Sequence, residues 1–183
     1  PTLGQELKRK AVLALALVLA AIIAYISYAF RGISKGPVPS WVFGVGAIVA
    51  LAHDILLVLG VFIFLGHFAG VQVDALFVTA LLTILGFSVH DTIVVYDRIR
   101  EGLKDRARKT FAEIINESIN NTLVRSLNTS ISTLLVLVAL YLFGGTVIQY
   151  FVLALLLGIL TGTYSSIFIA SPLLLVGQKL LKR

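Results

Sequence analysis

The sequence has no cysteine and few charged residues, and each of these features excludes a class of protein. Without cysteine the chain can form neither a disulfide nor a thiolate metal site. Charged residues make up 13% of the 183 residues, whereas a soluble domain carries roughly 25%. With 58% hydrophobic residues and a mean hydropathy of +1.00, the composition indicates an integral membrane protein.

Long apolar runs recur along the whole chain, each near the length of about 20 residues that a helix needs to cross a bilayer. They are too long and too continuous for the alternating strands of a membrane β-barrel. We therefore predict an all-α membrane protein, a single transmembrane domain over 1–183 built as a bundle of five helices. The predicted spans are 11–30, 41–65, 75–97, 123–143 and 147–176, and the last is expected to tilt or to bend near 161–163.

The fifteen Lys and Arg residues are distributed unevenly over the connections between these spans. The connections after the first and third spans and the C-terminal end carry most of them, whereas 66–74 and 144–146 carry none. The positive-inside rule then places the N-terminus outside and the C-terminus in the cytoplasm. Because the sequence starts at Pro1, a preceding segment is expected. Topology accounts for the net charge of +6, and since no aromatics alternate with Lys and Arg, we expect no nucleic-acid binding.

The connection between the third and fourth spans is the longest polar segment of the chain. The apolar residues Ala107, Phe111, Ile114, Ile115 and Ile119 recur in it at helical spacing. Acidic residues and asparagines lie between them. This pattern predicts a short amphipathic helix over about 106–121, lying along the cytoplasmic membrane surface.

Asp91 is a carboxylate inside the third span, where a charge is costly and usually faces a partner or a wet cavity. Arg125 is predicted to lie at a similar depth, because the third and fourth spans run antiparallel from the same side. Thr129 shares its face at i+4, with Asn128 alongside, and Ser88 is expected to flank Asp91. Burial disfavours the charged carboxylate and a nearby guanidinium favours it, so the pair is suited to a proton relay. A static buried ion pair is the alternative.

His53 and Asp54 form a second polar site near the middle of the second span. Neighbouring residues on a helix point about 100° apart, so the two are not expected to face one partner. A relay role and a simple helix–helix hydrogen bond are equally compatible with the pattern. His90 adjoins Asp91 and points elsewhere; a neutral imidazole bonded to a backbone carbonyl is expected there.

No enzyme signature emerges from these residues, and we expect no enzymatic activity. The adjacent His90 and Asp91 cannot act as base and orienter of a hydrolase triad, and no GxSxG elbow occurs. The chain has neither HExxH metal-ligand spacing nor a phosphate-binding Walker loop, so no metal or organic cofactor is expected. Gly158 and Gly162 form a GxxxG pair, which permits close helix packing.

Three stretches resemble the membrane domain of the SecF family of bacterial protein-export proteins, within the resistance-nodulation-division (RND) superfamily. They are LAHDILL (51–57), GFSVHDTIVVYDRIRE (86–101) and INESINNTLVRSLNTSISTLL (115–135). The resemblance implies helices two to six of a six-helix domain, the first helix and a periplasmic domain being absent here. It also implies that Asp91 and Arg125 carry protons, with pathway lining or support from Ser88, His90, Thr92, Asn128, Thr129, Ser130, His53 and Asp54.

The function that this resemblance implies is accessory to protein export across the bacterial cytoplasmic membrane. Proton flow through the membrane domain would help to complete translocation, with protons as the coupling ion. The implied partners are SecD (separate or fused), the SecYEG channel, YajC, YidC, the translocating polypeptide and the lipid bilayer. The alternative within the superfamily is one half of a proton-coupled exporter of small molecules or lipids.

Overall fold

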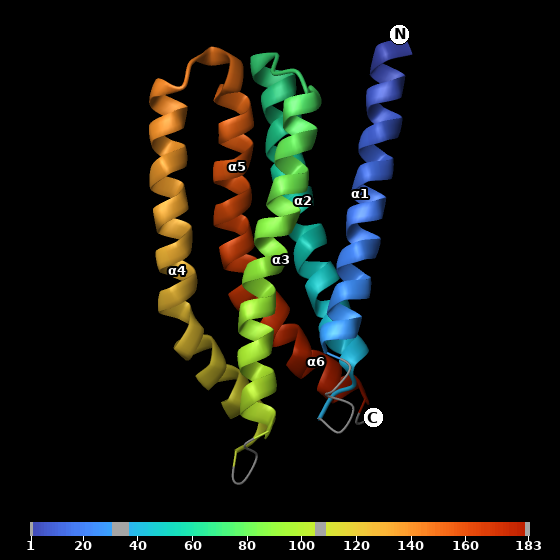
Figure 1. Cartoon of the computed structure of the whole chain (residues 1–183), viewed down its shortest axis with the longest axis vertical. Helices are drawn as coiled ribbons and strands as arrows, with labels where there is room; N and C mark the ends of the chain where they lie inside the picture. The colour runs from blue at the N-terminus through green and yellow to red at the C-terminus, as the bar shows by residue number, and fades with distance from the viewer. Residues whose placement is uncertain (1, 31–36, 105–108, 182–183) are drawn as a thin grey trace.

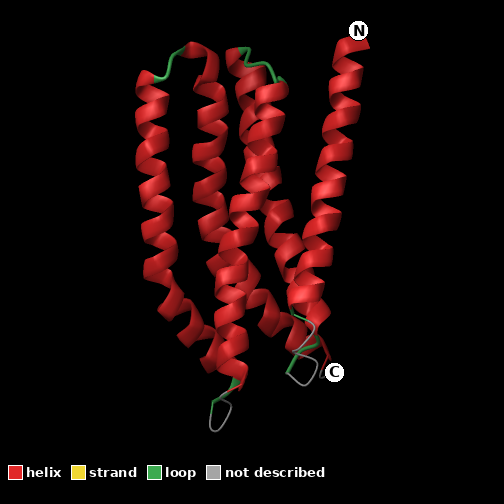
Figure 2. Cartoon of the chain, viewed as in Figure 1, coloured by secondary structure: helices red, strands yellow, loops and turns green. Residues whose placement is uncertain are grey.

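Long helices make up almost all of the computed structural model, which describes residues 2–30, 37–104 and 109–181 (Figures 1 and 2). In chain order they are α1 (Thr2–Ala29), α2 (Ser40–Ala69), α3 (Ala75–Lys104), α4 (Phe111–Phe143), α5 (Thr146–Ser165), the π-helical segment η2 (Ser166–Ala170) and α6 (Ser171–Leu181). Five helical segments in these ranges are long and apolar enough to cross a membrane, the last being Thr146–Leu181. The predicted all-α membrane bundle is thus confirmed.

Two hairpins connect the helices at one end of the bundle, where the N-terminus also lies (Figure 1). Gly70 ends α2 with φ of 66°, and its backbone N–H donates to the Leu65 carbonyl before the chain enters α3. Gly145, with φ of 79°, precedes α5 in the turn from α4. Both angles lie in the left-handed region, which glycine adopts without a steric penalty.

The centre of the bundle is the packing of α3 against α5. Gly158 and Gly162, the GxxxG pair, face α3, where a Cβ on Gly158 would overlap Ile84 and one on Gly162 would lie 3.0 Å from the Ser88 Cβ. The absence of both side chains therefore lets the two helices approach closely. The close packing that the sequence only permitted is present here between α5 and α3.

Two apolar clusters fill the interior, separated along the helices by a polar layer. One cluster, near the end that holds the C-terminus, includes Ile26, Phe30, Phe43, Tyr96, Ile99 and Phe111. The other, nearer the hairpins, includes Val58, Phe62, Phe77, Leu81, Ile84 and Ile159. Asp54, Ser88 and Asp91 lie on α2 and α3 between the stretches that supply these clusters, and all three are buried.

The predicted amphipathic segment is helical from Phe111, but it does not form a separate surface helix. It continues without a break into the fourth span, so α4 runs from Phe111 to Phe143. Phe111, Ile114 and Ile115 are buried against the first cluster instead of lying on the membrane surface. Thr110 caps the new start: its hydroxyl accepts the Glu113 N–H while the Glu113 carboxylate accepts the Thr110 N–H. Residues 106–108 of the prediction lie outside the described ranges.

The last span changes its helical register just after 161–163, where a bend was predicted. The π-helical segment η2 separates α5 from α6, and α6 runs obliquely across the end of the bundle (Figure 1). Short π-helical segments inside α-helices are frequent at functional sites. Here the segment begins at Ser166, immediately beside the polar layer.

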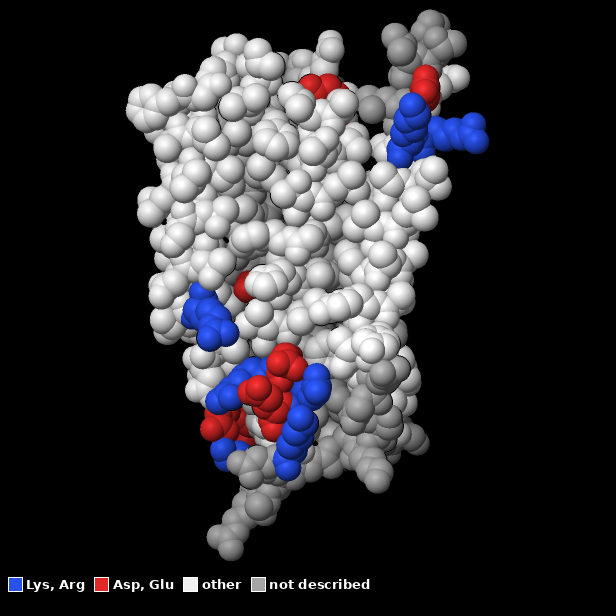
Figure 3. All heavy atoms as spheres, viewed as in Figure 1, with Lys and Arg blue, Asp and Glu red and all other residues white. Residues whose placement is uncertain are grey.

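Most charged side chains gather towards the two ends of the molecule, and the surface between them is largely apolar (Figure 3). The end with the loop between α3 and α4 holds Arg98, Arg100 and Lys104 in α3 and Lys109 in the connection to α4, and Lys179 lies in the last turn of α6. Lys8, Arg9 and Lys10 are exposed near the other end. The further basic residues of the topology prediction lie outside the described ranges: Arg31, Lys35, Arg106, Arg108, Lys182 and Arg183.

Adding a methyl group at Gly158 should weaken the α3–α5 contact. We expect Gly158→Ala to lower the stability of the detergent-solubilised protein by about 1–3 kcal/mol, the range for overpacking a close contact. Gly60→Ala is the matched control, since nothing lies within 4 Å of a Cβ placed there. Thermal unfolding followed by circular dichroism provides the measurement. Equal stability of the two variants would contradict the assigned contact.

Candidate functional site

Asp91 of α3 is the centre of the candidate site, buried with 6% of its surface exposed. Its Oδ1 accepts a hydrogen bond of 2.8 Å from the Ser126 hydroxyl of α4, and its Oδ2 accepts one of 3.1 Å from the Ser166 hydroxyl of η2. Hydrogen bonds to a charged group compensate part of the cost of burying it. Three helical segments thus contribute to a carboxylate site in the interior of the membrane domain.

Arg125 does not contact Asp91, which corrects the predicted ion pair. Among the described residues no ion pair joins the two, and the Arg125 side chain is exposed. The predicted depth was correct, because Ser126, the next residue along α4, bonds Asp91. The predicted face was wrong, since residues adjacent in a helix point about 100° apart.

The buried face of α4 is a row of hydroxyl side chains spaced four residues apart: Ser118, Thr122, Ser126 and Ser130. Ser130 reaches α5, where its hydroxyl lies 2.5 Å from that of Thr163. Asn128 and Thr129, predicted as pathway lining, are exposed on the outer face with Arg125. The Thr129 hydroxyl donates to the Arg125 carbonyl of its own helix, so it does not line the interior.

A second carboxylate, Asp54 of α2, is buried still more completely, with 0% exposure. Its Oδ2 accepts hydrogen bonds from Ser88 of α3 at 2.6 Å and from Ser165 of α5 at 2.7 Å. Its Oδ1 lies 3.0 Å from Nδ1 of His53, whose side chain is 34% exposed. Ser88 therefore supports Asp54, whereas the sequence predicted that it would flank Asp91.

The two remaining predicted residues behave differently from each other. His90 is exposed, and within 2–30, 37–104 and 109–181 no hydrogen bond to it is found, in contrast to the expected bond to a carbonyl. Thr92 is buried with 1% exposure, and its hydroxyl has no hydrogen-bond partner among the described residues. Thr92 follows Asp91 directly in α3, so an unsatisfied donor lies close to the site in the chain.

Sequence reasoning missed the serines that hold the two carboxylates, namely Ser126, Ser165 and Ser166. Ser165 and Ser166 are adjacent, yet they bond different carboxylates on different helices, Asp54 on α2 and Asp91 on α3. Their signal in the sequence was a pair of hydroxyl residues in the middle of an otherwise apolar span. That signal says nothing about which carboxylate each hydroxyl reaches, because this depends on the rotation of α5.

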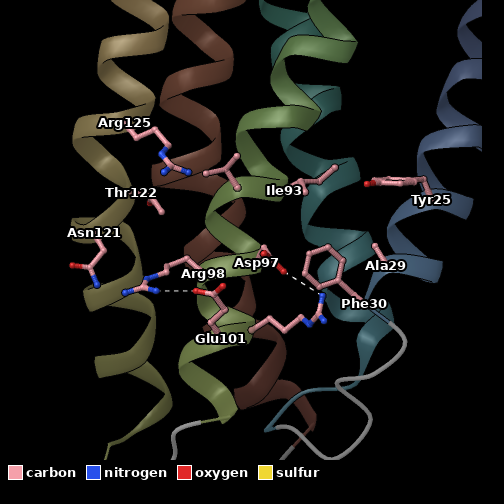
Figure 4. Close-up of a pocket in the computed structure, with 12 residues that line it drawn as sticks. Tyr25, Ala29, Phe30, Ile93, Asp97, Arg98, Glu101, Asn121, Thr122 and Arg125 are labelled. Carbon is pink, nitrogen blue, oxygen red and sulfur yellow. Dashed lines mark hydrogen bonds and ion pairs between the residues drawn. The ribbon is translucent and has the colours of Figure 1, made fainter.

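A polar cavity of about 750 Å³ opens beside the site, between α1, α3 and α4. Figure 4 shows Arg98 and Glu101 of α3 paired within it, with Arg125 above them on α4 and its guanidinium directed towards α3. Asp97 and Arg100 form a second pair. The cavity thus leads from the charged end of the bundle to Arg125, one residue before Ser126. It can hold water beside Asn121, Thr122 and Arg125 of α4.

The chain matches known proteins over nearly its whole length. The family model for the C-terminal part of the protein-export membrane proteins SecD and SecF matches residues 1–179. The protein translocase subunit SecF of Thermobaculum terrenum is 53% identical over 95% of this chain and 54% of its own length. The protein translocase subunit SecDF of Thermus thermophilus is 43% identical over 94% of this chain and 22% of its own length.

A solved structure supports the same relationship. The crystal structure of SecDF in its super-membrane-facing form superposes with a TM-score of 0.83 and 41% sequence identity, covering 98% of this chain and 23% of that one. This chain spans about half the length of the curated SecF relatives that it matches. By its sequence and its fold, the chain belongs to the SecD/SecF family of protein-export membrane proteins.

Proposed function

We propose that this chain is the membrane domain of an accessory subunit of the Sec protein-export machinery. It couples proton flow across the bacterial cytoplasmic membrane to the completion of protein translocation. The observation that carries the proposal is Asp91, a membrane-embedded carboxylate held by hydroxyl groups from two other helical segments. Ionisable residues at such depth usually serve a pathway for ions or protons.

Asp91 is the proton-binding group in this mechanism. When it is ionised, Ser126 and Ser166 both donate to its oxygens, as the structure has them. A protonated carboxyl group carries a hydrogen of its own and becomes a donor, so at least one of these contacts must rearrange. Binding and release of a proton would shift the balance between two packings of α3, α4 and η2, because a ligand favours the state that binds it more tightly.

Arg125 contributes from the outer face of α4. A guanidinium stays charged at physiological pH, and one at membrane depth requires a polar or acidic neighbour. Arg125, Asn128 and Thr129 share the exposed face of α4, so we propose that this face docks against the SecD half, which supplies that neighbour. The cavity shown in Figure 4 would bring water and protons from the charged end of the bundle to this interface.

The orientation and the remaining partners follow from the same proposal. The basic end with Arg98, Arg100 and Lys104 faces the cytoplasm, and the hairpin end faces outward, by the positive-inside rule. SecD, the SecYEG channel, YajC and YidC are the proposed partners, and the translocating polypeptide is the substrate. The relatives reported above are translocase subunits, which favours protein export over the export of small molecules or lipids. No catalytic step is assigned to the chain.

Asp91→Asn should abolish proton-dependent export while the complex still assembles. The amide keeps the shape of the side chain and an acceptor oxygen for a serine hydroxyl, but it cannot take up or release a proton at physiological pH. Translocation of a secreted substrate into membrane vesicles, with and without a proton motive force, provides the measurement.

Asp74→Asn is the matched control. Asp74 lies in the connection before α3, where it accepts the Phe77 N–H, and asparagine can replace it in that role. We expect export at the wild-type rate in this variant. Wild-type export by the Asp91→Asn variant as well would refute the assignment of Asp91 as the proton carrier.

A cysteine at Asn128 should form a cross-link with the SecD half. The natural chain contains no cysteine, so Asn128→Cys introduces a single thiol on the polar outer face of α4. Leu56→Cys is the control, on an exposed apolar position of α2 where lipid is expected. Each thiol is labelled with a maleimide that carries a benzophenone, which on irradiation inserts into a nearby C–H bond of a neighbouring protein. The products are resolved by electrophoresis of the membrane fraction. Equal cross-linking from both positions would argue against a specific α4 interface.

A further inference from the structure

Asp54 is a second buried carboxylate to which the proposed proton relay assigns no role. With 0% exposure it is more completely buried than Asp91, and its hydrogen-bond partners come from three helices: His53 of α2, Ser88 of α3 and Ser165 of α5. A single one of these hydrogen bonds would be enough to join two helices. The convergence of three hydrogen-bond partners indicates that the position of this carboxylate, and of the groups bound to it, is tightly defined.

Ser165 and Ser166 connect the two carboxylates through the main chain. Each hydroxyl has one proton to donate and two acceptors within reach. Ser165 lies 2.7 Å from Asp54 Oδ2 and 3.2 Å from the Gly162 carbonyl. Ser166 lies 3.1 Å from Asp91 Oδ2 and 3.0 Å from the Thr163 carbonyl. The Ser165 distances favour the carboxylate, whereas Ser166 is nearly equidistant and can donate to either acceptor.

The peptide that joins these serines is also the start of the π-helical segment η2. Two carbonyl groups of η2 are bonded by side chains: Ser171 donates to the Ser166 carbonyl at 2.9 Å, and Tyr96 of α3 donates to the Ala170 carbonyl at 2.9 Å. The segment is therefore fixed at its end by Tyr96 and just before its start by the bond between Ser165 and Asp54. The Ser166 hydroxyl lies between these two fixed points.

We infer that Asp54 is a positioning residue for proton exchange at Asp91: by holding Ser165, it sets the start of η2 so that the Ser166 hydroxyl reaches Asp91. This inference rests on the proposed role of Asp91. Without the bond to Asp54, the start of η2 relaxes and Ser166 donates to the Thr163 carbonyl instead. The ionised form of Asp91 then keeps Ser126 as its donor but loses Ser166.

Two hydrogen-bonded routes connect the carboxylates. Ser88 bonds Asp54 from α3, one turn before Asp91. The Ser165–Ser166 peptide carries the second route, to the Asp91 oxygen itself. His53 is the only basic group within ion-pair distance of either carboxylate in the part of the chain that the structure describes. It bonds Asp54 from the same helix, while α3 and α5 contribute the hydroxyls of Ser88 and Ser165. Around Asp91, α4 and η2 also contribute hydroxyls, and Arg125 is exposed.

The inference is tested by the pH dependence of carbodiimide labelling of Asp91. Dicyclohexylcarbodiimide modifies protonated carboxyl groups in apolar surroundings, and peptide mass spectrometry resolves Asp91 from Asp54. In the assembled complex with its SecD half, Ser165→Ala should move the pH midpoint of Asp91 labelling upward by about one unit, because a charged carboxylate loses one hydrogen bond. Ser165→Thr, which keeps the hydroxyl, should restore the wild-type midpoint.

Two further variants make the result decisive. Ser132→Ala is the matched control, since the Ser132 hydroxyl donates to the Asn128 carbonyl on the exposed face of α4 and should leave the midpoint unchanged. Ser165→Cys, which keeps the volume but donates weakly, replaces the alanine variant if that variant fails to assemble, and should shift the midpoint in the same direction.

The possible failures are distinguishable from each other. An unchanged midpoint in an assembled Ser165→Ala or Ser165→Cys complex would overturn the positioning role of Asp54 and leave the role of Asp91 intact. Labelling of wild-type Asp91 that does not vary with pH would overturn the proposed function, and the inference with it.

Discussion

The donation of serine hydroxyls to two buried carboxylates is the interaction on which the rest of this structure depends. A carboxylate in the interior of a membrane domain loses the stabilisation of water, and only polar groups of the protein can replace it. Asp54 and Asp91 obtain these groups from α3, α4, α5 and η2. Every helix of the inner bundle must therefore keep its rotation and its depth for either site to exist. The polar layer thus fixes the relative positions of helices whose other contacts are largely apolar.

Close approach of α5 to α3 makes this arrangement possible. Serine side chains are short, so their hydroxyls reach a neighbouring helix only where the backbones lie near each other. Gly158 and Gly162 provide that approach, about two turns and one turn before Ser165 and Ser166 respectively. The apolar clusters on either side place the layer in a surrounding of low polarity, where hydrogen bonds are electrostatically stronger. The hydrogen bonds of Ser165 and Ser166 consequently depend on the close packing of α5 against α3.

The two faces of α4 divide the polar residues of that helix between the inside and the outside of the domain. Hydroxyls at every fourth residue face α3 and α5, whereas Arg125, Asn128 and Thr129 are exposed, with the Arg125 guanidinium at the cavity beside α3. In the proposed mechanism the inner face serves the proton site and the outer face serves the SecD half. Residues that are adjacent in sequence, such as Arg125 and Ser126, then transmit a change from one side of the helix to the other. In that mechanism the cavity beside Arg125 would supply water at this boundary.

The sequence by itself determined the all-α membrane fold, the five spans and the family, and it located the carboxylates Asp91 and Asp54 inside two of the spans, because hydropathy and charge are local properties of the chain. It also located the depth at which α4 meets Asp91. The tertiary structure alone decided the partners: Ser126 instead of Arg125 for Asp91, and Ser88 with Ser165 for Asp54. It also decided that 111–121 joins α4 and that η2 interrupts the last span. The physical reason is the rotation of each helix about its axis. Adjacent side chains point about 100° apart, and only the packing against neighbouring helices decides which of the two faces inward.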